Sequence, residues 1–486
     1  MRQYTEAIAI TDTKPRVRLS ILIAVYNEAN SIKTVLDRVV AAVQEQQITA
    51  EVILVDNGSR DQSYEIAAEF SEAHPEASLL LVRLTENAGK GAAIRLAIGK
   101  AQGEFCIIQD ADFEYDPADY SRLLKPLLAG EADVVLGSRF LFGEQRRPLG
   151  FWQATVNHLI SGASGVATGL ALSDVETGYK AFRTSLAQSV PLQSNTFGLD
   201  PELVVQFARR RARFMEVPIQ YRGRTPEQGK KIRAVDTLDA LGTILRTRFF
   251  SAAYKDPGAN ILAAMSRAKR FNQWMADTIA PFVRGEVLEL GAGIGNLTML
   301  LANGKDLYRA TDTDEEQLFE LRARMEYRPD VVSGRFDFSK AEEVERFQRS
   351  ADTIVCLNVL EHVEDDRQAL KNIRQCLRPG GSAIVLVPHG PELFGSIDAV
   401  LEHKRRYTKD DLLQKMADAG LKVEQVIDFN RATRPGWYLN GKVLQRKTIS
   451  PLQLKIFDLL VPMWRRVDTH LPWPANSLIA IGMADE

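Results

Sequence analysis

The stretch FCIIQDADFE, residues 105–114, joins an apolar run to three acidic side chains. Phe105–Ile108 has the length and composition of a buried strand, and Asp110, Asp112 and Glu114 follow it directly. The carboxyl ends of strands line the ligand crevice of an open α/β sheet. Because residues two apart on an extended segment project to one side, the spacing predicts that the three carboxylates hold one Mg²⁺ or Mn²⁺ ion. The alternative is an acidic turn that caps the next helix near Pro117.

The same alternation of apolar runs and amphipathic, helix-length segments continues on both sides of this stretch, which favours an α/β fold. The expected strands of the first half are Ser20–Val25, Val52–Val55, Leu79–Leu84, Phe105–Ile108 and Val134–Leu136. The pattern breaks at Pro257-Gly258, and a second series begins with a helix near Ile261–Phe282. Its expected strands are Val287–Leu290, Leu307–Thr311, Thr353–Leu357, Ala383–Val387, Leu421–Ile427 and Ser477–Ile481.

The length of the chain also indicates more than one domain. Its 486 residues are about three times the ~150 residues of a typical domain. Because the second series restarts a complete sheet, we place one domain at residues 1–255 and the other at residues 256–486.

The composition excludes several classes of function. A net charge of −2 and short basic runs argue against a nucleic-acid partner. No run of about 18 apolar residues and no apolar leader occur, so neither a membrane span nor a signal peptide is expected. Cys106, Cys356 and Cys376 lack the spacing of a zinc site or a disulfide framework. We therefore expect a cytoplasmic protein whose membrane contact, where there is any, is peripheral and on the inner face.

Several short motifs of the first half occur in a fixed order, and the first five of them follow expected strands. They are Tyr26-Asn27-Glu28, Asp56-Asn57-Gly58-Ser59, Asn87-Ala88-Gly89-Lys90-Gly91, Asp110-Ala111-Asp112, Gly137-Ser138-Arg139, Ser173-Asp174 with Thr177-Gly178-Tyr179, and Glu216-Val217-Pro218-Ile219 leading to Gly229-Lys230-Lys231. Together they resemble the family-2 glycosyltransferases, most closely the dolichyl- or polyprenyl-phosphate sugar transferases, over about residues 20–250. Two positions depart from that pattern: Ala24 stands in place of a proline, and Asn57 in place of a second aspartate.

This resemblance implies a GT-A-like domain that binds a GDP- or UDP-sugar. It assigns Glu28, Asp56 and Lys90 to the donor, and the metal and diphosphate to Asp110, Asp112 and Glu114. Arg139 and residues 224–231 would face phosphates. The implied acceptor is a polyprenyl phosphate or a lipid-linked glycan, and an ionised phosphate acceptor needs no strong base.

Two further features of the first half leave alternatives open. Transfer to a sugar hydroxyl in place of a lipid phosphate would need a base near Asp200 or Glu202. Apolar residues at helical spacing, interspersed with arginines, predict a helix within Lys230–Tyr254 that either lies on an anionic membrane or packs against the rest of the protein.

The second half opens with VLELGAGIG, residues 287–295, an apolar strand that runs into a glycine-rich turn and a helix near Asn296–Ala302. Its glycines allow a ligand to approach the backbone closely. Asp312 ends the next expected strand, where a carboxylate can accept both hydroxyls of a ribose. These features suit an adenosine-containing ligand, and on their own they leave a dinucleotide open.

The remaining motifs of the second half resemble class I methyltransferases. They are Phe336-Asp337-Phe338, Asn358-Val359-Leu360-Glu361-His362-Val363, and Leu377-Arg378-Pro379-Gly380-Gly381. The resemblance implies a Rossmann-like sheet of order 3-2-1-4-5-7-6 that binds S-adenosylmethionine. The residues assigned to that cofactor are Glu289, Gly291, Gly293, Gly295, Asp312, Asp337 and Asn358. His362, His403 and Tyr407 are the candidate bases, with surface histidines as the alternative.

Together the two halves predict a bifunctional enzyme. The first activity is a metal-dependent, inverting sugar transfer, and the second is methylation of a glycan-related small molecule. The alternative is a glycosyltransferase that carries a noncatalytic module for S-adenosylmethionine binding or docking.

Overall fold

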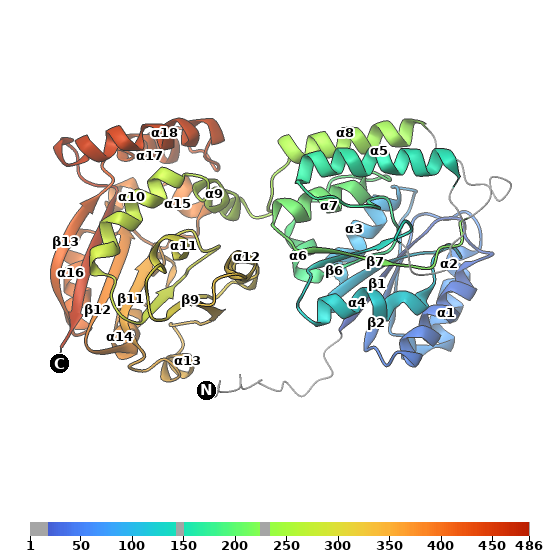
Figure 1. Ribbon diagram of the computed structural model, residues 1–486, viewed down its shortest axis with the longest axis horizontal. Coiled ribbons are helices and arrows are strands. Elements are labelled where there is room, and N and C mark those ends of the chain that lie inside the picture. Colours follow the sequence, from blue (N-terminus) through green and yellow to red (C-terminus); the bar gives the residue numbers. More distant parts are fainter. Residues whose placement is uncertain (1–17, 142–149, 224–233, 486) are drawn as a thin grey trace. The chain divides into compact units, whose positions relative to one another are not determined.

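The computed structural model describes residues 18–141, 150–223 and 234–485. The chain forms two compact units, Met1–Ala253 and Tyr254–Glu486, and each has a sheet with helices on its faces (Figure 1). No helix within the described ranges combines the length and the hydropathy needed to cross a membrane.

The N-terminal unit alternates strands and helices, as expected from its sequence. Its strands are β1 (Leu19–Val25), β2 (Ala50–Asp56), β3 (Leu79–Arg83), β4 (Phe105–Asp110), β5 (Val134–Ser138), β6 (Lys180–Arg183) and β7 (Phe214–Pro218). Its α-helices are α1 (Ile32–Glu45), α2 (Ser63–Ala73), α3 (Lys90–Lys100), α4 (Tyr120–Leu128), α5 (Phe151–Thr168), α6 (Thr184–Ser189), α7 (Leu199–Arg209) and α8 (Ala234–Phe249), with short 3₁₀ turns η1 (Pro75–Ala77) and η2 (Pro117–Asp119).

The first sheet has the order β3-β2-β1-β4-β6-β5-β7. Only β6 runs against its neighbours, between β4 and β5. In the register of the central strands, Val25 of β1 faces Asp56 of β2, and Ala24 faces Asp110 of β4. The carboxyl ends of these strands therefore bring Asp56 and Asp110 to the two sides of the loop that follows β1.

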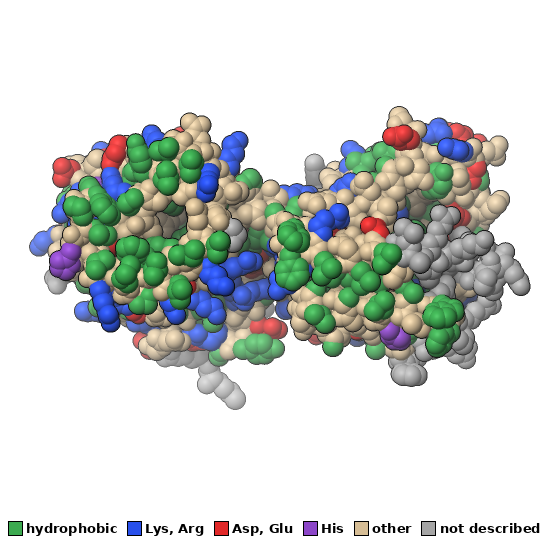
Figure 2. Space-filling view, turned by 90° about the horizontal axis from the view of Figure 1, so that it is seen from above, with side chains coloured by type: hydrophobic (Ala, Val, Ile, Leu, Met, Phe, Trp, Pro, Cys, Tyr) green, Lys and Arg blue, Asp and Glu red, His purple; other side chains and the backbone are tan. Residues whose placement is uncertain are grey.

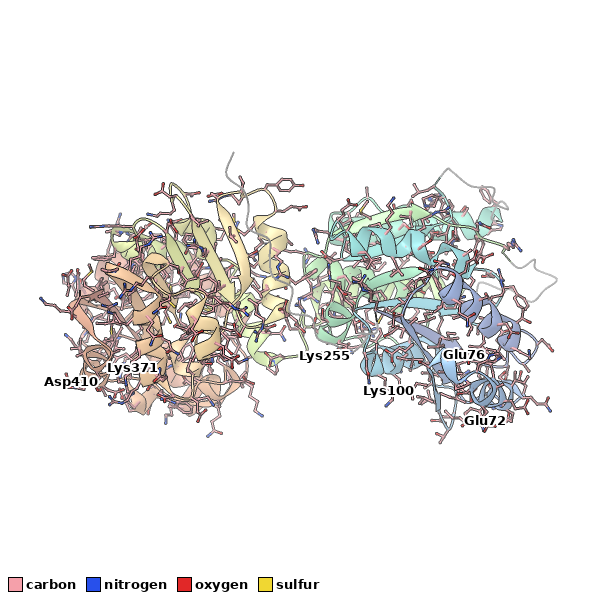
Figure 3. The ribbon with its side chains drawn as sticks, turned by 90° about the horizontal axis from the view of Figure 1, so that it is seen from below. Glu72, Glu76, Lys100, Lys255, Lys371 and Asp410 are labelled. Carbon is pink, nitrogen blue, oxygen red and sulfur yellow. The ribbon has the colours of Figure 1, made fainter. Side chains whose placement is uncertain are left out.

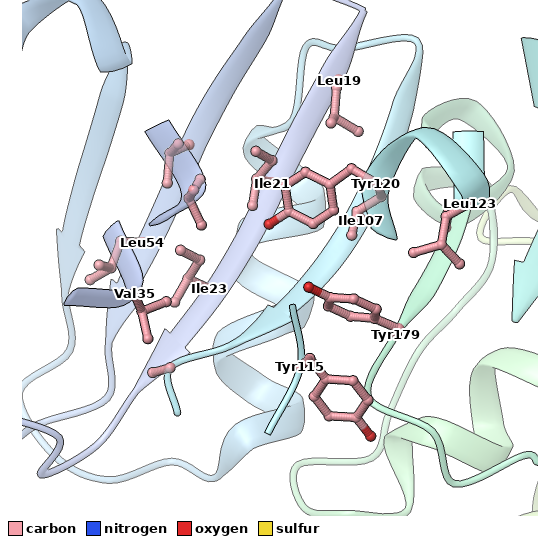
Figure 4. Close-up of a cluster of buried hydrophobic side chains, with 14 of the residues drawn as sticks. Leu19, Ile21, Ile23, Val35, Leu54, Ile107, Tyr115, Tyr120, Leu123 and Tyr179 are labelled. Atoms are coloured by element: carbon pink, nitrogen blue, oxygen red, sulfur yellow. The ribbon is translucent and has the colours of Figure 1, made fainter. Parts of the chain in front are cut away.

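The hydrophobic core next to this edge of the sheet includes tyrosine side chains with polar hydroxyl groups (Figure 4). Leu19, Ile21 and Ile23 of β1 are fully buried. Tyr120 and Tyr179 are fully buried as well, and both hydroxyls donate to Oε1 of Gln109 at 2.8 Å. These bonds satisfy the buried polar groups next to Asp110 and fix the end of β4 where the predicted site begins.

The C-terminal unit begins with two helices and then builds a second sheet. Its strands are β8 (Val287–Leu290), β9 (Tyr308–Asp312), β10 (Val331–Arg335), β11 (Ala351–Leu357), β12 (Leu377–Pro388), β13 (Leu421–Phe429) and β14 (Ser477–Ala484). Its helices are α9 (Pro257–Met265), α10 (Lys269–Ile279), η4 (Ala280–Phe282), α11 (Thr298–Leu301), α12 (Glu315–Met325), α13 (Ala341–Glu345), η5 (Leu360–His362), α14 (Asp366–Cys376), η6 (Pro391–Leu393), α15 (Ser396–Val400), α16 (Lys409–Asp418), α17 (Arg434–Tyr438), η7 (Leu439–Val443), α18 (Pro451–Val467) and η8 (Asp468–His470).

The second sheet has the order β10-β9-β8-β11-β12-β14-β13, which confirms the predicted order 3-2-1-4-5-7-6. Strand β14 is antiparallel to β12 and β13. Successive residues of its strands, such as Ile354 and Val355, belong to two separate hydrophobic clusters. Both faces of the sheet are therefore covered, as in other parallel sheets.

The prediction of a single helix near Ile261–Phe282 is wrong in detail, because the structure has two helices there, α9 and α10. Ala268 leaves the helical conformation, with ψ at 69°. The side chain of Asn272 then bonds to the carbonyl of Met265 at 3.2 Å. This break turns Phe271 and Trp274 into the core.

Charged side chains lie on the outer faces of the helices (Figure 3). Glu72 and Lys100 of the N-terminal unit and Lys371 of the C-terminal unit are exposed, whereas Leu370 and Ile373, beside Lys371, are buried. The helices thus have the amphipathic pattern on which their prediction rested.

Candidate active sites

The donor side of the N-terminal site lies at the ends of β1 and β2. Asp56 is fully buried, its Oδ2 has no hydrogen-bond partner among the residues that the structure describes, and Nε of Arg83 lies 3.5 Å from that atom. Glu28 accepts a 2.6 Å hydrogen bond from Ser31. A cavity of about 530 Å³ opens beside Asp56, and its lining includes Tyr26, Ser59, Arg83 and Asn87. A buried, incompletely bonded carboxylate next to a polar cavity suits the hydroxyls of a ribose.

Asp110 and Asp112 follow β4 at the next position along the sheet edge. Nζ of Lys90, the first residue of α3, donates to Asp110 at 2.5 Å. Burial lowers the pKa of Lys90, but the nearby charges of Asp110 and Asp200 outweigh it, so the pKa is raised. The ammonium group of Lys90 therefore occupies the position on Asp110 that a bound metal cation would take. Oδ1 of Asp112 accepts a hydrogen bond from the backbone amide of Glu114 at 3.0 Å.

Glu114 lies deeper than the two aspartates. Its side chain is buried, and the hydroxyl of Tyr221 donates to it at 3.1 Å. Asp110 and Asp112 are therefore the carboxylates best placed for a cation that also binds diphosphate oxygens. One or two carboxylates plus substrate phosphates form a common Mg²⁺ site.

The structure explains why the Thr177-Gly178-Tyr179 motif has a glycine at position 178. A Cβ atom on this residue would lie 2.5 Å from Oδ2 of Asp110. Its amide donates to the hydroxyl of Tyr115 at 2.6 Å. A side chain at position 178 would therefore displace the carboxylate of Asp110.

Arg139, which the sequence assigns to a phosphate, is engaged within the protein. Its guanidinium group donates to both oxygens of Asp174 at 2.7 Å and lies 5.2 Å from the centre of the Tyr221 ring. The other predicted phosphate ligands, residues 224–231, lie outside the described residues.

Glu176 is a candidate residue that the sequence analysis missed. Its Oε1 is buried and has no hydrogen-bond partner within the described ranges. Burial, and then the charge of Asp200, raise the pKa of Glu176. By contrast, Asp200 is paired with Lys180 at 2.5 Å, and Glu202 accepts the amides of Gln193 and Ser194. The available signal was an acidic residue inside the Asp174–Tyr179 motif.

The C-terminal site centres on the glycine turn after β8. Gly291, Gly293 and Gly295 all have positive φ angles, and a Cβ on Gly291 would lie 2.3 Å from Val359. Oδ2 of Asp312, at the end of β9, accepts the amide of Gly293 at 2.8 Å. The close packing leaves no room for a side chain at Gly291, and the hydrogen bond from Gly293 joins the turn to the predicted ribose ligand, which fits an adenosine-containing cofactor.

The other predicted cofactor residues lie at the same edge of the sheet. Glu289 is buried and accepts a 2.5 Å bond from Thr298, and burial raises the pKa of Glu289 to about 7. Asp337 follows β10, where Ser339 and Lys340 hold its pKa low against the effect of burial. Asn358 follows β11 in a left-handed conformation, with φ at 55°.

His362 and His403 meet beside Glu361. The two rings lie 4.9 Å apart, edge to face. Although His362 is exposed at the surface, partial desolvation of its ring, reinforced by His403, lowers the pKa of His362 to about 4. Glu361 is fully buried, which raises its pKa to about 8. Nδ1 of His403 lies 3.0 Å from Asp398, whose pKa falls to about 2 because the hydrogen bonds and charges of His403 and Arg406 outweigh burial.

Tyr407, the third candidate base, is fully buried. Its hydroxyl donates to Asp366 at 2.9 Å, and Lys415 donates to the same oxygen. These bonds indicate a structural role for Tyr407.

Each unit thus has an α/β sheet with a polar binding edge. Residues 20–189 match the family model described as "Glycosyl transferase family 2", and residues 288–383 match the model described as "Methyltransferase domain". The chain therefore contains a family-2 glycosyltransferase domain with a GT-A-like α/β sheet, followed by a Rossmann-like methyltransferase domain.

Curated relatives match the first of these domains. An undecaprenyl-phosphate 4-deoxy-4-formamido-L-arabinose transferase of Edwardsiella ictaluri is 30% identical over 46% of this chain and 65% of its own length. A dolichol-phosphate mannosyltransferase of Pyrococcus furiosus is 24% identical over 44% of this chain and 61% of its own. The chain therefore spans about three fifths of the length of these relatives.

Solved structures resemble each half. Glucosyl-3-phosphoglycerate synthase of Mycobacterium tuberculosis, in complex with Mn²⁺ and UDP, is 20% identical over 48% of this chain and 79% of its own, with a TM-score of 0.36. An S-adenosylmethionine-dependent methyltransferase of Mesorhizobium loti is 17% identical over 43% of this chain and 95% of its own, with a TM-score of 0.32.

Proposed function

We propose that the N-terminal domain transfers a sugar from a GDP- or UDP-sugar to a polyprenyl phosphate or lipid-linked glycan. The observation that carries this proposal is the row of Asp56, Lys90, Asp110 and Asp112 along one sheet edge. The curated relatives are named as transferases for undecaprenyl phosphate and dolichol phosphate. These names support a polyprenyl phosphate as the acceptor class.

The chemistry follows from the charges at this edge. Glu28 and Asp56 hold the base and ribose of the donor, while Asp110 and Asp112 hold a Mg²⁺ or Mn²⁺ ion on the diphosphate. The bound cation neutralises charge on the departing diphosphate. Lys90 supplies a second positive charge to the same phosphates, and a phosphate acceptor arrives already ionised. The residues therefore position and neutralise the reactants, and the displacement inverts the sugar carbon in one step.

The C-terminal domain, in our proposal, binds S-adenosylmethionine and methylates a glycan-related small molecule. Asp312 accepts the ribose hydroxyls, Asp337 contacts the adenine, and the amides of the glycine turn approach the methionine part. His362 and His403, whose rings lie 4.9 Å apart, are the side chains proposed to promote loss of the proton from a hydroxyl acceptor, as bases or as ligands of a cation that takes the place of a base.

Peripheral membrane contact also belongs to this proposal. Helices α5 and α8 pack against each other, and their outer side carries apolar side chains (Figure 2). Eight of these side chains are more than half exposed: Phe151, Trp152, Leu159, Val166, Leu238, Leu245, Phe249 and Phe250. Arg246 and Arg248 lie among them. An apolar face with basic residues suits a bilayer with anionic headgroups, where a polyprenyl phosphate would reside.

The variant Asp112→Asn tests the sugar transfer. It removes a metal-binding charge with little change in shape, so we expect the transfer rate from a nucleotide-sugar to undecaprenyl phosphate, with Mn²⁺ present, to fall by at least about 100-fold. Glu72→Gln, an exposed change in the same domain, is the matched control and should keep full activity. Transfer by Asp112→Asn at the normal rate would refute the metal assignment.

Methylation is tested separately, with labelled S-adenosylmethionine and glycan extracts. Binding of the cofactor together with label transfer supports a second enzyme activity. Binding without transfer to any extract would instead favour a noncatalytic docking module.

A further inference from the structure

Glu361 has an unusual environment for an acidic side chain. It is fully buried, and neither carboxylate oxygen has a hydrogen-bond partner within the described part of the chain. A buried charge without a partner is strongly unfavourable unless it is protonated, paired or bound to a metal. Nε2 of His403 lies 3.8 Å away, which is too far for a hydrogen bond.

His403 is oriented so that this nitrogen faces Glu361. Its Nδ1 bonds to Asp398, which also accepts bonds from Arg406, Trp437 and the amide of Gly395. Because Asp398 is a buried carboxylate with a cationic partner, Nδ1 of His403 is the donor and Nε2 carries the free lone pair. A histidine held by a carboxylate in this way is the usual outer support of a metal ligand.

His362 completes the group. The donor atoms of Glu361, His362 and His403 all lie within 4.8 Å of one another. The backbone holds the two segments together, since the amide of Lys404 donates to the carbonyl of Glu361 at 2.9 Å. Val359, two residues before Glu361, packs against Gly291 of the glycine turn. The group is therefore built next to the predicted cofactor pocket.

We propose that Glu361, His362 and His403 bind one divalent cation of the Zn²⁺ or Mn²⁺ type in the methyltransferase domain. Two imidazole nitrogens and one carboxylate suit these ions better than Mg²⁺, which prefers oxygen ligands. Three protein ligands leave open positions for an acceptor hydroxyl. This cation is separate from the one proposed for Asp110 and Asp112.

The role of the cation rests on the proposed methyl transfer. A hydroxyl bound to it loses its proton to solvent more readily, because the cation stabilises the alkoxide. A lone pair of that oxygen then forms the bond to the methyl carbon, and the carbon–sulfur electron pair stays on sulfur, which leaves a neutral thioether. The imidazoles act as ligands, and the metal replaces a free base.

Metal content of the full-length protein tests the site independently of activity. Wild type, Asp112→Asn, Glu361→Gln and the double variant are stripped with chelator and equilibrated with Zn²⁺, Mn²⁺ or Co²⁺, and bound metal is measured by mass spectrometry. In the Asp112→Asn background, we expect Glu361→Gln to remove one equivalent and the visible absorption of Co²⁺. Glu364→Gln, an exposed change three residues away, is the matched control.

Two outcomes separate this proposal from that for the N-terminal domain. Equal metal content in Asp112→Asn and in the double variant would overturn the site at Glu361. Equal content in wild type and Asp112→Asn, measured with a nucleoside diphosphate present, would count against the N-terminal cation alone. His403→Gln removes a second ligand and should lose the same equivalent, and a thermal melt of each variant verifies folding.

Discussion

Three carboxylates show how individual residues mark the two sites. Asp56 and Glu361 are fully buried and Glu289 nearly so, and each follows or ends a strand at its carboxyl edge. Burial of a carboxylate costs stability because the charged form loses its water. Such residues are retained where a ligand or cation supplies the missing partner, so they are functional candidates on physical grounds.

Glu289 makes the stability of the methyltransferase domain depend on pH. Its pKa is about 7 in the folded state, against 4.5 for the exposed residue. Between these values the folded state binds the proton more tightly, so the free energy of unfolding falls as the pH rises through this window. At 1.36 kcal/mol per unit, the loss is on the order of 3 kcal/mol. Glu289→Gln should therefore gain stability relative to wild type between pH 5 and pH 8, measured by thermal unfolding.

Glu286 provides a control of opposite sign. Arg378 and Arg309 lower its pKa, so its stabilising effect is present at neutral pH and is lost as the pH falls through its folded pKa. Glu286→Gln should destabilise the protein at pH 8 and have less effect in acid. A Glu289→Gln variant whose difference from wild type stays constant with pH would contradict the assignment to burial.

Residues named by strand-end motifs were predictable, whereas residues defined by distant partners were not. Asp56, Asp110 and Asp312 each end a strand in the structure as the sequence predicted. The pairing of Arg139 with Asp174, 35 positions away, leaves no local pattern in the chain. The raised pKa values of Glu176 and Glu361 likewise result from burial, which depends on the packing of the whole domain.

Among the elements, strands were easier to predict than helix ends. The sheet of the second domain has the order that its resemblance to class I methyltransferases implied. The break between α9 and α10 was missed, since apolar periodicity continues across it. Core packing of Phe271 and Trp274 decides where the helix stops.

The outer face of α8 yields a prediction about membrane binding. Leu245 and Phe249 are exposed one helical turn apart. Full burial of such a side chain is worth about 1.5–3 kcal/mol, so Leu245→Glu or Phe249→Glu should weaken binding to phosphatidylglycerol-containing vesicles by about ten-fold or more. Co-sedimentation measures the effect, and stability should change little because both positions are exposed.

Leu128 is the matched control for this face. It is half exposed at the end of α4, away from α5 and α8 in the contacts of the fold. Leu128→Glu should leave vesicle binding unchanged. Equal loss in Leu128→Glu and Phe249→Glu would mean that general charge, and not the α5 and α8 face, controls binding.

At the scale of the whole molecule, the chain consists of two cores. Within the described residues of the N-terminal unit, one hydrophobic cluster lies between one face of the first sheet and helices that include α1 and α4. Two others cover the faces of the second sheet. Each unit has its own sheet and its own binding edge.

Ligands should therefore stabilise the two units separately. A scanning calorimetry trace is expected to resolve two transitions. S-adenosylmethionine at about 100 times its Kd adds about 2.7 kcal/mol to the domain that binds it, which corresponds to a rise of roughly 5–10 °C in Tm. It should move only one transition, and a nucleotide diphosphate with Mn²⁺ should move the other. Asp312→Ala should abolish the first shift and Asp112→Asn the second, each without effect on its counterpart. If either ligand moved both transitions together, the two cores would unfold as one cooperative unit, and the view of two independent transferase domains would be wrong.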